Sequence, residues 1–304
     1  MKTFIVTGAT QGLGRAIAGA LAADPQHHVV LGVRDVARGT EVARALGPNA
    51  EARRLDCASL SDVRRFAAEW HGPIAGLVNN AGVQQTTGVQ WTPDGHEETI
   101  AVNHLAALRL TLDLLPWLEG GRVLFIGSGT HNPHHRFATL FGFRGGRFTS
   151  VAALARGEAE ATDDRQAGMD RYATSKLLNM LAGMELARRI APEHTLFSTL
   201  DPGLMPGTGL ARTSPAPVRW AWTNILPRIA PLLPDTSTTE RSAAAAAWLL
   251  TKADLSGRNG EVFSYDWEPS TRVWDRARDP ELARRALDES LALLGASLPA
   301  PGGG

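Results

Sequence analysis

The stretch TFIVTGATQGLG, residues 3–14, decides the fold predicted for this chain. Its first five residues are β-branched or aromatic, as in a buried strand. Gly8, Gly12 and Gly14 follow, and a helical pattern begins at Gly12. Glycines at a strand-to-helix turn let the backbone approach a pyrophosphate, and the helix N-terminus offers unpaired N–H groups and partial positive charge. The stretch therefore predicts a dinucleotide-binding loop. The alternative is a simple tight turn, because the spacing is not Gly-x-Gly-x-x-Gly.

The same alternation of strand and helix continues outward from this stretch. Seven strands are predicted, at residues 3–7, 28–33, 50–55, 74–78, 122–127, 195–200 and 261–264. Helical patterns between them cover residues 12–23, 36–46, 59–70, 95–118, 169–190 and 237–251. This alternation predicts parallel strands joined by crossover helices. We expect an α/β fold with a single Rossmann-type, doubly wound domain over residues 1–295: a mainly parallel seven-stranded sheet with helices on both faces.

The composition favours an ordinary soluble globular protein. Of 304 residues, 43% are apolar, and 31 basic residues balance 31 acidic ones. The basic residues are dispersed, so we expect no nucleic-acid partner and no polybasic membrane anchor. No apolar run reaches the ~18 residues of a transmembrane helix. The single cysteine, Cys57, excludes an internal disulfide, and a strand beginning at Thr3 leaves no room for a signal peptide, so a cytoplasmic protein is expected.

The residues after the second predicted strand indicate which dinucleotide binds. They read Arg34-Asp35. An acidic side chain here would bind the ribose 2′-hydroxyl of NAD, whereas an arginine pairs with the 2′-phosphate of NADP. Arg34 stands nearer the strand end and Arg15 can add a second positive charge, so we expect NADP. The alternative is a solvated Arg34 beside an Asp35 that caps the next helix, although such a cap is compatible with phosphate binding by Arg34.

A tyrosine and a lysine four positions apart predict acid–base chemistry. The chain has only two tyrosines and three lysines, and Tyr172 and Lys176 share one helical pattern. Residues four apart lie on one helix face, so the Lys176 ammonium is expected near the Tyr172 phenol. There it would favour the ionised phenol and lower a pKa that is ordinarily about 10. Such a phenol is a better acid or base near neutral pH.

The order of further motifs identifies a family resemblance. Polar motifs follow the glycine loop in the sequence Leu55-Asp56, Asn79-Asn80-Ala81-Gly82, Asn103, Ser128, Tyr172 with Lys176, and Asp201-Pro202-Gly203. With these motifs the chain, from residue 3 to about 265, resembles the short-chain dehydrogenase/reductase family. Segments 34–35, 92–95, 102–105 and 201–210 are similar to its retinol dehydrogenase and protochlorophyllide reductase branch.

The resemblance implies roles for individual residues. The catalytic set would be Asn103, Ser128, Tyr172 and Lys176. Asp56 would contact adenine, and the backbone at Pro202-Gly203 would approach the nicotinamide carboxamide. The full set of cofactor contacts would be Thr7, Gly8, Thr10, Gln11, Gly12, Leu13, Gly14, Arg15, Arg34, Asp56, Cys57, Asn80, Ala81, Gly82, Tyr172, Lys176, Pro202, Gly203, Leu204 and Thr208.

The residue types of the catalytic set indicate how such a site works. Hydride transfer to a carbonyl carbon builds negative charge on oxygen, which the hydroxyls of Ser128 and Tyr172 can receive. Tyr172 then supplies the proton, and it is the base when an alcohol is oxidised. Lys176 would stabilise the phenolate and hold the cofactor ribose, while Asn103 would position a water beside Lys176. Taken singly, three of these residues have an ordinary alternative role. Ser128 could be a turn hydroxyl, Asn103 a polar residue of a helix, and Tyr172 a residue at the edge of the core.

Two segments interrupt the alternation, and both follow strand ends, where open α/β sheets bind ligands. Residues 129–168 separate Ser128 from Tyr172 and should shape substrate access. Their apolar side chains could line a pocket, while their charged ones look solvated; the apolar set is Phe137, Leu140, Phe141, Phe143, Phe148 and Val151. No cysteine or carboxylate neighbours His131, His134 and His135, so they indicate a polar loop face or a substrate contact rather than a metal site.

The second segment, residues 201–236, resembles the mobile substrate loop of the family. Trp220, Trp222, Ile225 and Leu226 could close over a bulky apolar substrate, bury in a dimer or touch a membrane surface. Residues 296–304, rich in proline and glycine, are expected to be a disordered tail.

Together these features predict an NADP(H)-dependent oxidoreductase. It would transfer a hydride between the nicotinamide and a carbonyl or alcohol of a bulky apolar small molecule. One alternative is a reductase of an activated C=C bond in an enone or tetrapyrrole-like molecule. Another is an NADP-binding regulator without turnover, which the four catalytic residue types argue against. Monomer and homodimer both stay open, because the family commonly dimerises through helices around Asn103 and Lys176 and the 129–168 insertion could block that contact.

Overall fold

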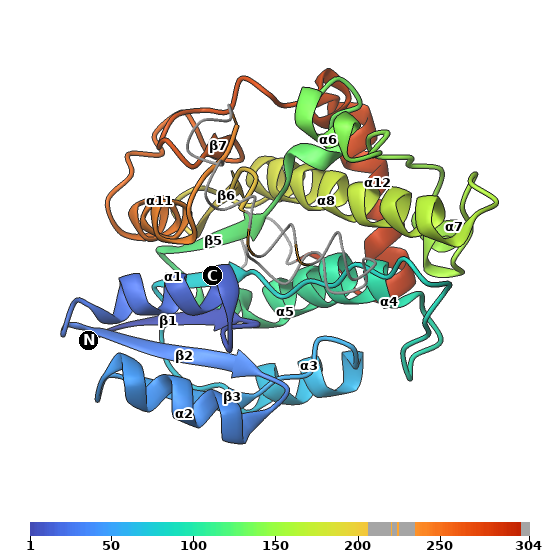
Figure 1. Ribbon diagram of the computed structural model, residues 1–304. Coiled ribbons are helices and arrows are strands. Elements are labelled where there is room, and N and C mark those ends of the chain that lie inside the picture. Colours follow the sequence, from blue (N-terminus) through green and yellow to red (C-terminus); the bar gives the residue numbers. More distant parts are fainter. Residues whose placement is uncertain (206–219, 221–223, 225–234, 299–304) are drawn as a thin grey trace.

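The computed structural model describes residues 1–205, 220, 224 and 235–298, and its centre is one parallel sheet (Figure 1). The strands are β1 (Lys2–Thr7), β2 (His27–Val33), β3 (Ala50–Arg54), β4 (Gly76–Asn79), β5 (Gly121–Ile126), β6 (Thr195–Asp201) and β7 (Val262–Ser264). They lie in the order β3-β2-β1-β4-β5-β6-β7, and every neighbouring pair is parallel. The predicted seven-stranded Rossmann-type sheet is confirmed. Strand order reverses between β1 and β4, the point where such sheets bind ligands.

Helices cover both faces of the sheet, as predicted (Figure 1). One face carries α1 (Gly12–Ala22), α2 (Val36–Leu46) and α11 (Thr239–Thr251). The other carries α3 (Leu60–Ala68), α5 (Ala106–Leu114) and α8 (Asp164–Arg189), with α12 (Pro280–Leu294) packed against α8. Successive strand residues point to opposite faces. In β1, therefore, Phe4 and Val6 belong to the first core and Ile5 to the second.

The predicted helices include none at α12, although the residues that mark its two ends are present in the sequence. Asp279 accepts hydrogen bonds from the N–H groups of Glu281 and Leu282, Pro280 is the first helical residue, and Gly295 ends the helix with a φ of 56°. An aspartate cap, a first-turn proline and a left-handed glycine are the usual marks of helix ends. The last fifty residues thus add a helix that closes the core over α8.

The two longest predicted helices differ from the structure. The pattern over residues 95–118 divides into α4 (Glu98–Ile100), a π-helical turn η1 (Ala101–Leu105), α5 and a 3₁₀ turn η2 (Leu115–Trp117). The pattern over residues 169–190 starts earlier, because Asp163 caps α8 by accepting from the Gln166 N–H. The segment 129–168 is also not irregular throughout, since it contains η3 (Gly129–His131), α6 (Arg136–Leu140) and α7 (Val151–Ala155). A last 3₁₀ turn, η6, covers Asp275–Arg278.

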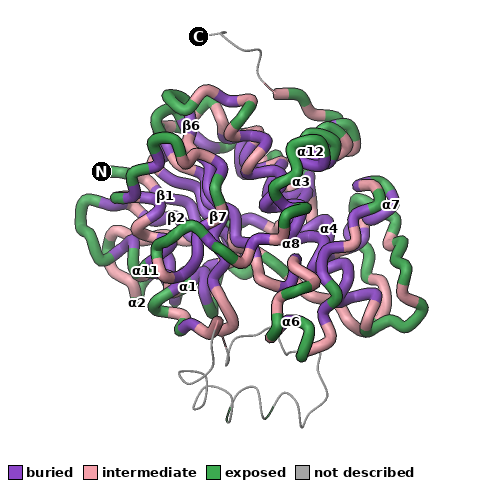
Figure 2. The backbone as a smooth tube through the Cα atoms, turned by 90° about the horizontal axis from the view of Figure 1, so that it is seen from above, coloured by how far each residue is buried: buried purple, intermediate pink, exposed green. Residues whose placement is uncertain are grey.

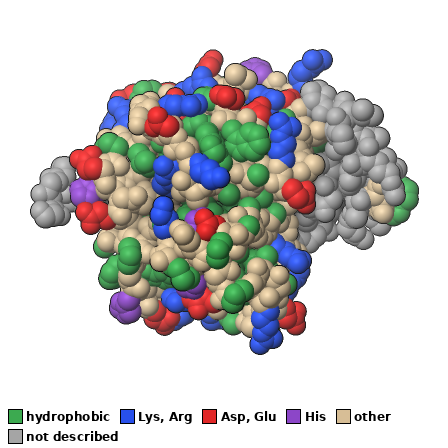
Figure 3. Space-filling model, turned by 90° about the vertical axis from the view of Figure 1, so that its left-hand side faces the viewer, with side chains coloured by type: hydrophobic (Ala, Val, Ile, Leu, Met, Phe, Trp, Pro, Cys, Tyr) green, Lys and Arg blue, Asp and Glu red, His purple; other side chains and the backbone are tan. Residues whose placement is uncertain are grey.

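Burial is concentrated on the strands and along α8 (Figure 2). Nineteen of the 26 residues of α8 are buried, because the sheet lies on one side of it and α4, α12 and η1 on others. The surface seen in Figure 3 intersperses basic and acidic side chains, in keeping with a net charge of zero. In the part of the chain that the structure describes, no helix is long and apolar enough to cross a membrane.

Candidate active site

The predicted site residues gather at the carboxyl ends of the parallel strands. The glycine loop follows β1, Arg34 follows β2, Asp56 follows β3, Asn80 follows β4 and Ser128 follows β5. Tyr172 and Lys176 reach this edge from α8, and Pro202, Gly203 and Leu204 follow β6. Thr208 lies outside the described residues, as do Trp222, Ile225, Leu226 and the predicted tail beyond residue 298.

The glycine loop leaves the N-terminus of α1 open to a ligand. Gln11 precedes the helix, and its side chain caps none of the helix N–H groups. Gly8 and Gly12 have φ values of 67° and 54°, which disfavour a side chain, and a Cβ built on Gly12 meets nothing within 4 Å. A Cβ on Gly14 would instead lie 2.7 Å from the Gly8 carbonyl oxygen. The missing side chain of Gly14 therefore lets α1 pack against the backbone of Gly8, and that of Gly12 leaves room for a ligand to approach the backbone.

Thr7 and Asn80 join this loop to the end of β4. The Thr7 hydroxyl accepts hydrogen bonds from the N–H groups of Asn80 (3.0 Å) and Ala81 (2.9 Å). The Asn80 side-chain amide donates to the Thr7 carbonyl at 2.8 Å. Thr7 and Asn80, both predicted to contact a cofactor, thus also hold the glycine loop against the end of β4. Leu13 differs, because its side chain is buried in the core beside the sheet.

Three arginines come from β2 and the helices that contact it: Arg34 follows β2, Arg15 lies in α1 and Arg38 in α2. Arg34 and Arg15 are exposed, and neither guanidinium has a partner among the described residues. Asp35 caps α2 by accepting from the Arg38 N–H at 3.0 Å, as the alternative interpretation predicted. Arg38 itself was not predicted. Its guanidinium donates to the Gln11 side chain at 3.3 Å, and its position four residues after Arg34 in a helical pattern is the signal that could have indicated it.

The adenine end of the predicted site is ordered by local hydrogen bonds. The Asp56 carboxylate accepts from the Ala58 N–H at 3.0 Å, and the Asp56 N–H donates to Asp62 at 2.7 Å. Burial raises the pKa of the neighbouring Cys57 thiol to about 12, with the negative charges of Asp56 and Asp62 adding to the effect. A protonated thiol is a poor nucleophile, so Cys57 offers packing and contact rather than reactivity.

Ser128 and Tyr172 meet at the centre of the edge. Burial raises the pKa of the Tyr172 phenol to about 12, the hydrogen bond from Ser128 lowers it by less, and the charge of Asp201 raises it. The expectation that Lys176 makes the phenol more acidic is therefore not met. The Lys176 Nζ lies 5.6 Å from the centroid of the Tyr172 ring and donates to the Ile126 carbonyl at 3.1 Å. Desolvation of the phenol is the dominant effect.

Burial also lowers the pKa of Lys176 to about 8. The folded chain then releases this proton at a lower pH than an unfolded chain, whose lysine titrates near 10.5. Because the unfolded state holds more protons between these values, the burial of Lys176 opposes folding below about pH 8, and the opposition fades as the pH rises to 10.5.

The lysine titration can be measured directly, because the chain has only three lysines. We expect the ¹³Cε signal of Lys176 to titrate near pH 8, below the ordinary value of about 10.4 for a lysine. Nuclear magnetic resonance of lysine-labelled protein would show this, with Lys176→Arg assigning the signal. A Lys176 signal that titrates near the ordinary value would contradict the lowered pKa of this buried lysine.

Asn103 lies in the π-helical turn η1, and its amide is fully engaged. The Asn103 Oδ1 accepts from the Val83 N–H at 2.7 Å, and the Nδ2 donates to the Val83 carbonyl and to the Ser175 hydroxyl, each at 2.9 Å. The side chain therefore ties the loop after β4 to α8. That Asn103 positions a water beside Lys176 stays a prediction. A Cβ on Gly82 would lie 3.3 Å from the Asn103 Oδ1 and 3.6 Å from the Lys176 Nζ, so all three border one space.

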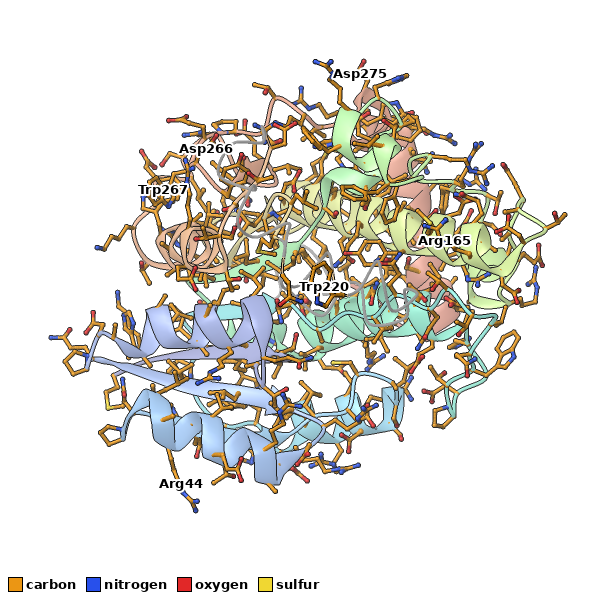
Figure 4. The ribbon with its side chains drawn as sticks, in the orientation of Figure 1. Arg44, Arg165, Trp220, Asp266, Trp267 and Asp275 are labelled. Atoms are coloured by element: carbon orange, nitrogen blue, oxygen red, sulfur yellow. The ribbon has the colours of Figure 1, made fainter. Side chains whose placement is uncertain are left out.

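The 129–168 insertion supplies an apolar wall beside Tyr172. The ring of Phe143 lies 6.1 Å from that of Tyr172, and Ala138, Met169 and Ala173 complete a small cluster with Phe141 against it. Phe148 and Val151, predicted as pocket residues, instead belong to the main core, and Leu140 is 75% exposed. Trp220, labelled in Figure 4, is 61% exposed.

The three histidines of the insertion do not come together as one polar face. His131 is fully buried, His134 is exposed, and His135 caps α6 by accepting from the Ala138 N–H. No group of three or more potential metal ligands occurs among the described residues. Burial of His131 is at odds with the alternative of a polar loop face for this residue, and the alternative of a substrate contact stays a prediction.

Known proteins are similar to this chain in sequence. A family model described as short chain dehydrogenase matches residues 2–139. Protochlorophyllide reductase A of Oryza sativa subsp. japonica is 32% identical to this chain, over 96% of this chain and 80% of that protein. The chain belongs to the short-chain dehydrogenase/reductase family. Protochlorophyllide reductase B of the same organism is 30% identical over 96% of the chain and 77% of its own length, which confirms the predicted branch.

Solved structures share the fold of this chain. An uncharacterized protein from Mycobacterium paratuberculosis superimposes with a TM-score of 0.74 at 26% identity, over 99% of this chain and 96% of that one. A protein assigned as an NAD(P)-dependent gluconate 5-dehydrogenase from Beutenbergia cavernae, with bound NADP, gives 0.62 at 26% identity, over 88% of this chain and 96% of that one.

Proposed function

We propose that this chain is an NADP(H)-dependent reductase of a carbonyl group in a bulky, largely apolar small molecule. The observation that carries the proposal is the approach of the Ser128 side chain to the Tyr172 phenol, close enough to lower the pKa of that phenol, at the strand edge beside an uncapped helix N-terminus. Two hydroxyls that already meet can receive developing negative charge on one substrate oxygen without reorganisation.

The chain fits the cofactor at three points. The N-terminus of α1 would bind the pyrophosphate, because its N–H groups lack a side-chain cap and Gly12 leaves the approach open. Arg34, with Arg15 and Arg38 near it, would pair with the 2′-phosphate. Lys176 and the backbone at Pro202-Gly203 would contact the nicotinamide riboside. When bound, the nicotinamide supplies the hydride, and the protein supplies binding, orientation and the proton.

Tyr172 is the proposed proton donor, and its environment favours reduction. A phenol whose pKa burial raises to about 12 stays protonated near neutral pH, which suits it to donate rather than to abstract a proton. Lys176 provides a positive charge that stabilises the phenolate once the proton has left. Phe143 and the cluster around it exclude water from the ring of Tyr172 and offer an apolar wall to the substrate.

A second candidate is reduction of an activated C=C bond. It is favoured by the relatives, which are named for protochlorophyllide, a tetrapyrrole. A screen of aldehydes, ketones and enones, followed by NADPH absorbance and by mass spectrometry of the products, tests both candidates. We expect alcohols from the carbonyl compounds. Saturated ketones from the enones would favour the second candidate, and NADPH binding without any turnover would favour a regulator.

Arg34→Ala should weaken NADPH binding by about 10- to 100-fold, equivalent to about 1.5–3 kcal/mol for a charge-assisted pair, and should leave NADH binding nearly unchanged. Titration calorimetry with both cofactors measures the ratio. Arg44→Ala is a suitable control, because Arg44 is exposed on the opposite end of α2 (Figure 4). Equal losses for both cofactors would reject Arg34 as the selecting residue.

A further inference from the structure

The most buried histidine of the insertion contacts the backbone of the proposed catalytic serine. His131 has no exposed surface, and its Nδ1 lies 2.6 Å from the Ser128 carbonyl oxygen. Its Nε2 lies 3.1 Å from the backbone nitrogen of Trp274. We propose that His131 is a positioning residue, which orients Ser128 toward Tyr172 through the Ser128 carbonyl. This proposal rests on the function proposed above for Ser128.

The two contacts determine which nitrogen of His131 carries the proton. The Trp274 N–H can only donate, so the His131 Nε2 must accept. A neutral imidazole has one N–H, which therefore stands on Nδ1 and donates to the Ser128 carbonyl. Burial lowers the pKa of His131, so the ring stays neutral and the tautomer stays fixed. His131 thus accepts a hydrogen bond from the Trp274 N–H and donates one to the Ser128 carbonyl, and in this tautomer the two directions cannot be exchanged.

Ser128 needs such a contact because it sits where β5 ends and the chain turns. Its carbonyl also accepts from the His131 backbone N–H at 3.2 Å, and its hydroxyl accepts from the Thr130 N–H (3.3 Å) and the Thr130 hydroxyl (3.1 Å). Two consecutive residues, Thr130 and His131, thus turn back onto one serine. Of the groups that make these contacts, the imidazole is the one also bonded to a distant part of the chain, at Trp274. Misplacement of a reacting group by about 1 Å can cost about 100-fold in rate.

The adjacent Asn132 provides a matched comparison. Its side-chain amide donates to the Arg272 carbonyl at 2.8 Å, so it joins the same two segments without touching Ser128. A role that is only structural predicts similar effects from loss of either residue. A positioning role predicts that only His131 affects the Ser128–Tyr172 pair.

Two variants of His131 separate its two hydrogen bonds. The amide nitrogen of asparagine can take the place of Nδ1, so His131→Asn keeps a donor for the Ser128 carbonyl and loses the acceptor for Trp274. In His131→Gln the amide oxygen can take the place of Nε2, so the acceptor is kept and the donor to Ser128 is lost. Ser128→Ala and Asn132→Ala complete the set.

The first readout needs no substrate. The chain has two tyrosines, so ¹³Cζ-tyrosine labelling gives two signals, which Tyr172→Phe assigns. We expect the Tyr172 signal of His131→Gln to shift in the same direction as that of Ser128→Ala, and those of His131→Asn and Asn132→Ala to stay near the wild-type position. The second readout is turnover of nitrobenzaldehyde with NADPH: a fall in kcat of about 10- to 100-fold for His131→Gln with little change in KM, and near-wild-type kcat for His131→Asn.

Equal effects of His131→Gln and His131→Asn, or wild-type behaviour of His131→Gln beside an impaired Ser128→Ala, would overturn this inference alone. If Ser128→Ala itself matches wild type in both readouts, the proposed function of Ser128 fails, and this inference with it. Should His131→Gln not fold, ¹⁵N-histidine spectra of the wild-type protein still decide the matter, since a His131 ring protonated on Nε2 is incompatible with these two hydrogen bonds.

Discussion

Tyr172→Phe should remove turnover while NADPH still binds. The substitution deletes one hydroxyl and keeps the ring that packs near Phe143, so the fold and the cofactor site should persist. Loss of a positioned general acid costs about 10²- to 10⁴-fold in rate, and the loss of a hydrogen bond to the developing oxyanion adds to this. Single-turnover NADPH oxidation measures the chemical step, and NADPH fluorescence measures binding in the same sample.

Tyr265→Phe is the matched control, because it deletes the hydroxyl of the only other tyrosine. Tyr265 is also buried near the site, where its ring lies 2.6 Å from the position that a Cβ on Gly203 would occupy. We expect its kcat to stay within a few-fold of wild type. Turnover retained in Tyr172→Phe, or lost equally in both variants, would refute Tyr172 as the proton donor.

The sheet was predictable because its signals are local. A β-branched run, a glycine turn and a helical pattern occur within residues 3–23, and similar units recur along the chain. The placement of site residues follows from the sheet, since parallel strands end at one edge. The same kind of local signal occurs at both ends of α12, in Asp279, Pro280 and Gly295, so this helix too is predictable from its own residues.

Properties set by burial could not be predicted in this way. A four-residue spacing places Lys176 near Tyr172, but it does not tell how far water is removed from either group. In the structure desolvation raises the pKa of Tyr172 and lowers that of Lys176, which moves both groups toward their neutral forms. The buried state of His131 depends likewise on residue 274, which is 143 positions away along the chain.

The insertion 129–168 lengthens helix α8 and brings it into contact with the loop after β4. Its last residues are the first turn of α8, so the helix that carries Tyr172 and Lys176 extends beyond its predicted start at residue 169 to Asp164. This extension packs on the loop after β4, the loop that Asn103 holds from the other side through Val83. The loop after β4 forms one rim of the site, and it is contacted by α8 on one side and by Asn103 on the other. On the α8 side, Gly168 lies close to the backbone of Gln85 and Thr86.

Gly168→Ala should destabilise the fold, although alanine is the better helix former. The residue is helical within α8, where a glycine-to-alanine change alone gains roughly 0.5–1 kcal/mol. A Cβ at this position, however, would lie 1.8 Å from the Gln85 carbonyl oxygen and 2.9 Å from the Thr86 Cα. Both are backbone atoms, so no side-chain rotation relieves the overlap, and α8 or the loop must shift. Overpacking of this kind costs about 1–3 kcal/mol, and more where backbone must move.

Gly19→Ala is the control that isolates this contact, because Gly19 is also interior to a helix, α1, and its Cβ would meet only the Leu46 Cδ2 at 3.4 Å. We expect opposite signs in urea denaturation: a lower midpoint for Gly168→Ala and an unchanged or higher one for Gly19→Ala. Because a shift of the loop after β4 moves Asn80 and Gly82, kcat of Gly168→Ala should also fall while that of Gly19→Ala does not. Equal midpoints for the two variants would show that the loop moves aside freely, and the rim would then not be held by α8.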